Sequence, residues 1–173
     1  MQIRAASHND LPSLIDIQNQ AIRNSTASWR FDELTLEERT QWLDYQFDTG
    51  YPVYVAEEED GTVLGYASYR PFDTITGYRY TVENSVYVSD LAHGKGVGSK
   101  LMQAMIDHAN DSNKVHVILA NITGDNLASQ KLHRKFGFVK VGHFPEAGHK
   151  FDQWLDLTYW QLTIPMDPVL VED

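Results

Sequence analysis

The sequence contains no cysteine, and this absence removes several kinds of chemistry. Without cysteine the chain forms no disulfide, has no thiol nucleophile and offers no thiolate ligand for zinc. The seven histidines do not follow a metal-binding spacing such as His-Glu-x-x-His. We therefore expect an activity that requires no metal ion.

Long apolar runs are also missing. No segment approaches the roughly 20 consecutive apolar residues that a membrane-spanning helix needs. Residues 1–5 lack the basic-then-apolar order of a secretory signal peptide. These features favour a cytoplasmic protein that does not bind membranes.

Positive charge is scarce. The chain has 14 lysines and arginines against 24 acidic residues, which gives a formal net charge of -10. No run of lysine or arginine supplies the basic face that nucleic-acid binding requires. We therefore expect no nucleic-acid partner and interpret the acidity as a contribution to solubility.

The length and the order of elements indicate one mixed α/β domain. The 173 residues contain no repeat or linker, so we expect a single domain over residues 1–164 and a tail over residues 165–173. Two helices come early, then an antiparallel run of strands, then two strand–loop–helix units. The predicted strands cover residues 3–5, 51–57, 63–69, 82–88, 115–120, 138–141 and 154–162.

A glycine-rich loop, His93-Gly94-Lys95-Gly96-Val97-Gly98, lies between a predicted strand and a predicted helix. Its glycines let the backbone approach a ligand, and the first turn of a helix directs free N–H groups and a positive dipole end at an anion. The loop lacks the Gly-Lys-Ser/Thr ending of a P-loop and the spacing of the dinucleotide fingerprint. It predicts a phosphate or pyrophosphate site, with an ordinary glycine-rich turn as the alternative.

A second motif follows at a fixed distance: Asn126, Ser129, Leu132 and Phe136-Gly137-Phe138. Together the two motifs resemble those of the GCN5-related N-acetyltransferases. His93 departs from the glutamine or arginine that this family usually has, but the loop binds mainly through backbone N–H groups.

The resemblance implies the fold and the cosubstrate of that family. The implied fold is a mostly antiparallel twisted sheet of about seven strands flanked by about four helices. The implied cosubstrate is acetyl-CoA, whose thioester carbonyl would accept a hydrogen bond from a strand that leaves its neighbour, often at a bulge. The implied cofactor-binding residues are Val86, Tyr87, Val88, His93, Gly94, Lys95, Gly96, Val97, Gly98, Ser99, Asn126 and Ser129.

Segments 65–72, 81–88, 132–133 and 148–156 resemble the phosphinothricin and methionine sulfoximine–methionine sulfone acetyltransferases. This similarity extends to about Leu162. It implies acetyl transfer to the α-amino group of a small amino-acid-like compound, and a homodimer. We expect Trp154 and Trp160 at the interface between subunits.

Glu83 and His133 are the candidate catalytic residues. An amine must lose a proton before it attacks a thioester, and Glu83 matches the glutamate of the subfamily as the general base. The alternative is a glutamate on a solvated strand face. His133 stands where the superfamily often has a tyrosine as general acid. It either transfers a proton or only packs beside the cofactor.

An anionic group on the substrate would need a cation. Arg79, four residues before Glu83, is the first candidate by the family pattern and Arg70 is the second. Trp29 and Phe72, with Phe31 and Tyr69, are candidates for apolar walls. Each of these residues has a packing or surface role as its alternative.

Two other functions stay open at this point. In the first, the enzyme acetylates a protein N-terminus or a lysine. Arg79 and the aromatic residues argue against this and favour a small anionic acceptor. In the second, the domain binds acetyl-CoA without catalysis, and the presence of Glu83 argues against it.

Overall fold

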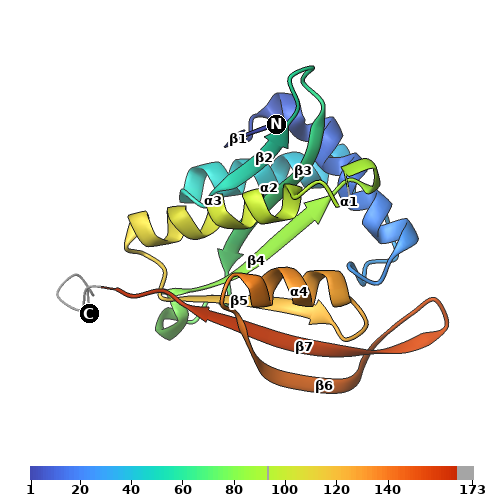
Figure 1. Ribbon diagram of the computed structural model, residues 1–173, viewed down its shortest axis with the longest axis vertical. Coiled ribbons are helices and arrows are strands. Elements are labelled where there is room, and N and C mark those ends of the chain that lie inside the picture. Colours follow the sequence, from blue (N-terminus) through green and yellow to red (C-terminus); the bar gives the residue numbers. More distant parts are fainter. Residues whose placement is uncertain (93, 167–173) are drawn as a thin grey trace.

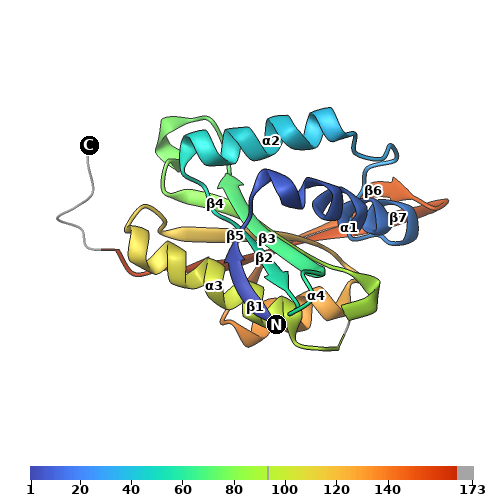
Figure 2. The same cartoon turned by 90° about the horizontal axis from the view of Figure 1, so that it is seen from above.

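The computed structural model describes residues 1–92 and 94–166, which form a seven-stranded sheet in the order β1-β2-β3-β4-β5-β7-β6. Helices α1 and α2 cover one face of this sheet, and α3 and α4 cover the other (Figures 1 and 2). Within the described residues, no helix combines the length and the apolar character needed to cross a bilayer. The predicted mixed α/β fold is confirmed.

All neighbouring strands are antiparallel except β4 and β5, which are parallel. The strands are β1 (Gln2–Ala5), β2 (Val53–Glu57), β3 (Val63–Pro71), β4 (Thr81–Val88), β5 (Val117–Thr123), β6 (Val139–Lys150) and β7 (Gln153–Thr163). The helices are α1 (Leu11–Asn24), α2 (Leu36–Thr49), α3 (Val97–Ser112) and α4 (Leu127–Lys135).

Each face of the sheet has its own apolar core. On one face Leu14 of α1 and Leu43 of α2, both with no exposed surface, pack against alternate residues of β2 and β3. On the other face Met102 and Met105 of α3 pack against β3, β4 and β5. The 3.6-residue and two-residue periodicities of the sequence therefore produce a sheet whose central strands are covered on both faces.

Trp160 corrects the expectation of an interface role for this residue. It is only 3% exposed and belongs to the α3 core, because β7 lies inside the sheet between β5 and β6. Its indole N–H donates to the hydroxyl of Thr158 at 3.0 Å. Trp154, by contrast, is 67% exposed.

The β6–β7 hairpin is longer than the sequence predicts. The predicted strand over residues 138–141 is observed as Val139–Lys150. Gly142, Pro145 and Gly148 interrupt the strand pattern in the sequence, but register shifts at 140–142 and 144–148 absorb them. The hairpin extends beyond the rest of the sheet (Figure 1) and closes one side of the molecule near α1 (Figure 2).

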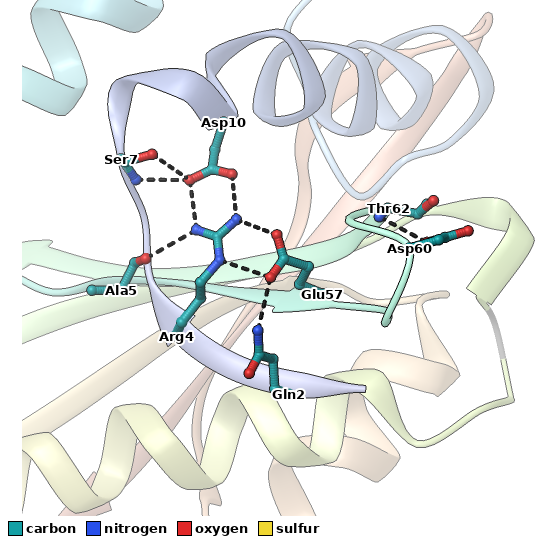
Figure 3. Close-up of polar contacts among 8 residues, drawn as sticks. All are labelled: Gln2, Arg4, Ala5, Ser7, Asp10, Glu57, Asp60 and Thr62. Atoms are coloured by element: carbon teal, nitrogen blue, oxygen red, sulfur yellow. Dashed lines mark hydrogen bonds and ion pairs between the residues drawn. The ribbon is translucent and has the colours of Figure 1, made fainter.

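An ion-pair network fixes the N-terminal edge of the sheet (Figure 3). The Arg4 guanidinium of β1 donates to both carboxylate oxygens of Asp10 at 2.8 Å and to Glu57 of β2 at 2.6 Å. Asp10 also accepts the backbone N–H of Ser7 at 2.7 Å, as part of a capping box. Because Arg4 donates to it, the pKa of the Asp10 carboxyl lies below its ordinary value.

Ile164, which directly follows β7, is anchored to the sheet. This side chain is 3% exposed, and its N–H donates to the carbonyl of His116 at 2.7 Å. Most of the predicted tail, residues 167–173, lies outside the described residues. The boundary at residue 164 stays a prediction.

Candidate active site

The candidate site is a cavity of about 810 Å³ where β4 and β5 separate. These strands pair only from Thr81 to Glu83 on β4, and β5 then continues with β7 as far as Thr123. The α1–α2 loop, α2 and the start of α4 supply the other walls. The sheet therefore opens next to the predicted catalytic residue.

The backbone of β4 directs donors into this opening. Successive residues of an antiparallel strand alternate between its two neighbours. Thr81 and Ser89 bond to β3, since Phe72 donates to the Thr81 carbonyl and the Ser89 N–H donates to Leu64. The N–H groups of Val86 and Val88 are therefore directed to the edge that β5 has left.

The separation of β4 and β5, and not a bulge in β4, leaves the edge of β4 free. The β3–β4 register runs without a shift from Gly65–Val88 to Pro71–Val82. The free edge of β4 thus arises because β5 diverges toward β7, not because β4 itself is distorted.

Glu83 lies at the rim of the opening. Its Oε2 accepts from Nη2 of Arg70 at 3.0 Å, and its Oε1 accepts from Nδ2 of Asn121 on β5 at 3.0 Å. The side chain of Glu83 is 17% exposed, whereas that of Arg70 is 58% exposed. A carboxylate held from both sides, with access to the cavity, has the geometry of a fixed proton acceptor.

His133 is buried below the opening, 4% exposed. Its Nδ1 lies 2.8 Å from the carbonyl of Ser129, so Nδ1 carries the proton. Its Nε2 then accepts from the amide of Asn84 at 3.1 Å. Burial lowers the pKa of His133, so the imidazole is neutral at neutral pH. In this arrangement it holds Asn84 and has no proton on Nε2.

The start of α3 has the features of an anion site. Gly94 and Gly96 adopt left-handed φ values of 79° and 78°, which only glycine takes easily. Gly96 is the N-cap of α3, and no side chain caps the helix there. Gly98 lets α3 pack closely on α4, since a Cβ there would lie 3.3 Å from the Cδ2 of Leu132. His93, the irregular residue of the motif, lies outside the described residues.

The second motif starts α4. The Oδ1 of Asn126 accepts from the N–H of Ser129 at 3.0 Å, which is an N-cap interaction. Both side chains also line the cavity. Gly137 ends the helix with a left-handed φ of 86°, as predicted.

Trp29 forms a wall of the cavity. Its indole N–H donates to Thr123 Oγ1 at 3.0 Å, and that hydroxyl donates to the carbonyl of Thr26 at 2.6 Å. The ring packs directly on Gly148 of β6. The α1–α2 loop is therefore fastened to the far end of the sheet.

Lys150 secures the same loop and was not predicted from the sequence. It is 2% exposed, and its ammonium donates to the carbonyls of Ile22, Ser25 and Ser28 at 2.7, 2.9 and 2.5 Å. These carbonyls belong to the end of α1 and the loop that follows it, where donors are missing. No local pattern marks such a contact, because it joins residues more than 120 positions apart.

The structure brings only some of the predicted substrate residues together. Arg70 and Trp29 line the cavity with Glu83, as do Val86 and Tyr87. Arg79 instead lines a second cavity of about 410 Å³ with His108 and Lys114. It lies in the turn after the short 3-10 helix Thr76–Tyr78, before β4 begins at Thr81. Phe72 packs on Tyr78, with ring centroids 5.2 Å apart, and does not line the site.

Comparison with known proteins agrees with this geometry. Residues 3–159 match the family described as an acetyltransferase (GNAT) domain. An L-methionine sulfoximine/L-methionine sulfone acetyltransferase of Pseudomonas paraeruginosa is 45% identical over 94% of both chains. An L-amino acid N-acyltransferase of Escherichia coli is 42% identical over 95% of this chain and 94% of its own.

A solved structure extends the agreement to three dimensions. A GNAT superfamily phosphinothricin acetyltransferase from Sinorhizobium meliloti, in complex with AcCoA, has a TM-score of 0.94 and 30% identity. The match covers 99% of this chain and 92% of that one. The chain therefore belongs to the GNAT acetyltransferase family and is an N-acetyltransferase.

Proposed function

We propose that this protein transfers the acetyl group of acetyl-CoA to the α-amino group of a small amino-acid-like compound. The compounds in view are methionine sulfoximine, methionine sulfone and phosphinothricin, on which the named relatives act. The observation that carries the proposal is the opening between β4 and β5, where Glu83 faces the free edge of β4.

The residues present fit acetyl-CoA. The uncapped N-terminus of α3 after Gly96 suits a pyrophosphate, because its first-turn N–H groups have no side-chain cap. The N–H groups of Val86 and Val88 suit the amide and thioester oxygens of an extended arm. When bound, acetyl-CoA supplies an acetyl group activated as a thioester.

The chain's own residues would then act at three points. Glu83 accepts a proton from the ammonium of the acceptor, directly or through water. The free amine would then bond to the acetyl carbon as the carbon–sulfur bond breaks, and the departing thiolate of CoA would take up the second proton of the amine, directly or through water. The N–H of Val86 donates to the carbonyl oxygen of the thioester, where negative charge develops. His133, neutral through burial, positions Asn84 under the opening. This mechanism uses no metal ion.

Arg70 and Trp29 are the predicted substrate contacts that line the cavity. Arg70 forms an ion pair with Glu83. It therefore positions the carboxylate that accepts the proton of the acceptor. Trp29 bounds the acceptor's side chain with an apolar surface. Arg79, in the second cavity, has no place in this proposal.

We also propose that the enzyme works as a homodimer in the cytoplasm. Exposed aromatic residues on the β6–β7 hairpin, Phe144 at 52% and Trp154 at 67%, support a protein interface there. Light scattering should give a dimer mass. A monomer at micromolar concentration would refute this part.

The test of the proposed function is a screen of acceptors by thiol release from acetyl-CoA. With free methionine sulfone, methionine sulfoximine or phosphinothricin as acceptor, the enzyme should release thiol from acetyl-CoA far faster than background hydrolysis does. A peptide with a free N-terminus and a polyamine should not. Equal rates with the peptide would favour a protein acceptor, and no release with any amine would refute the proposal.

A further inference from the structure

Arg39, on the inner face of α2, is a buried cation that lines the candidate active site. It is only 5% exposed. Its Cζ lies 3.5 Å from the ring centroid of Trp42 and 4.8 Å from that of Tyr66. Two aromatic faces thus hold the guanidinium in place between the helix and the sheet.

Two donors of the guanidinium lack hydrogen-bond partners. Its Nε and Nη2 are buried and unpaired in the part of the chain that the structure describes. Its sequence neighbour Glu38 is occupied, since it accepts from Arg30 at 3.0 Å and from Thr35 at 2.8 Å. A buried charge is costly unless a counter-ion or hydrogen-bond acceptor meets it. The site is therefore short of one anion.

The two unpaired atoms define the shape of that anion. Nε and Nη2 donate side by side along one edge of the guanidinium, the arrangement that receives both oxygens of a carboxylate. Arg70 and Arg30 also line the cavity, but each already pairs with a glutamate and is largely exposed. Arg39 is the buried arginine that lines the cavity, and its Nε and Nη2 are unpaired.

The position of Arg39 matches where an acceptor has to lie. Tyr66, under the guanidinium, is the register partner of Tyr87 and stacks on it at 5.4 Å. Tyr87 directly follows Val86, whose N–H points into the opening. A group bound by Arg39 therefore lies over the same stretch of β4 that would hold the reacting thioester.

We propose that Arg39 binds the α-carboxylate of the acceptor amino acid and so makes a free carboxylate a condition for acetylation. This inference rests on the proposed function and specifies its substrate class. The α-amine and α-carboxylate share one carbon, so holding the carboxylate at Arg39 presents the amine to the opening. Amino-acid amides, esters, polyamines and peptide N-termini lack the carboxylate at that place.

The test compares two acceptors, methionine sulfone and methionine sulfone amide, with three proteins. Arg39→Met keeps the apolar stem of the side chain and removes the donors. Arg30→Met is the matched control, because Arg30 lines the same cavity but is exposed and paired with Glu38. Thiol release gives kcat/KM for each acceptor, and thermal melting reports folding.

The wild type should prefer the acid over the amide by about 100-fold, since the amide leaves a buried cation unpaired. Arg39→Met should lower kcat/KM for the acid by about 100-fold, mainly through KM, and change the amide by less than about threefold. The KM for acetyl-CoA should stay the same. Arg30→Met should change neither acceptor by more than about threefold.

Three results would overturn the inference. A wild type that acetylates the amide as well as the acid excludes a carboxylate receptor, even if the variant fails to fold. An Arg39→Met enzyme that loses both acceptors equally would give Arg39 a structural role. An unchanged kcat/KM for the acid would show that the carboxylate binds elsewhere. If the wild type releases no thiol with either acceptor, the proposed function itself fails.

Discussion

Substitution of Gly148 by alanine should impair acceptor binding, although Gly148 does not itself line the cavity. A Cβ on Gly148 would lie 2.8 Å from Cη2 of Trp29 and closer still to Cζ3 and Cε3. Carbon atoms in contact need about 3.5 Å, so the indole has to retreat by roughly an ångström. That movement breaks the 3.0 Å hydrogen bond to Thr123 and shifts one wall of the cavity.

A displacement of this size at a substrate-positioning wall can cost up to about 100-fold in rate. We expect Gly148→Ala to lower kcat/KM for methionine sulfone by about 10- to 100-fold in the thiol-release assay. The overpacking should lower the free energy of unfolding by about 1–3 kcal/mol. The KM for acetyl-CoA should change little, because no residue of α3 lines the cavity that Trp29 bounds.

Gly142→Ala, on the same strand, is the matched control. A Cβ there would meet Tyr159 at 3.4 Å, an ordinary contact, so activity and stability should stay near wild type. Combining Gly148→Ala with Trp29→Leu should restore stability by making room for the methyl group. A Gly148→Ala enzyme with wild-type kcat/KM and melting temperature would refute the account of this wall.

Three further variants probe the supports of the fold. Lys150→Met should lower the free energy of unfolding, measured in urea, by about 3–5 kcal/mol, because three backbone carbonyls lose their donor. An unchanged urea midpoint would show that Lys150 does not stabilise the fold. The pKa of Asp10 is lowered by Arg4, so its contribution to stability is present above pH 3.8 and is lost as the pH falls through the folded-state pKa. Asp10→Asn should flatten that acid dependence, and an identical slope would contradict the ion-pair argument. Burial lowers the pKa of His133, so the unfolded chain binds a proton below about pH 6.5 that the native chain does not, and stability falls there. His133→Gln should remove this fall, and its persistence would assign it to another group.

The architecture could be predicted because most elements carry local signals. The capping boxes at Ser7 and Thr35 are short sequence patterns that mark the start of the first helical segments. Gly137 ends α4, and the alternation in β4 separates Glu83 from Val82. The long β6 strand was missed because bulges, which depend on pairing with β7, absorb its glycines and proline.

The site was predictable where a motif is contiguous. The start of α3, the Asn126 cap and Glu83 follow from short patterns, and the structure brings Asn126 and Glu83 to one opening. Arg79 does not reach this opening, because it lies in the turn before β4 and lines the second cavity. Arg39 and Lys150 could not be predicted as site residues, because their roles depend on burial and on contacts with residues far away in the sequence.

The central claim is that Glu83 accepts the proton of the amine beside the free edge of β4. Glu83→Gln keeps the shape of the side chain and the contact with Asn121 but removes the carboxylate. Its kcat, measured by thiol release at saturating acetyl-CoA and methionine sulfone, should fall by about 100- to 10,000-fold at neutral pH. The KM for acetyl-CoA should stay near wild type. Full turnover by Glu83→Gln, with a wild-type pH profile, would contradict the account.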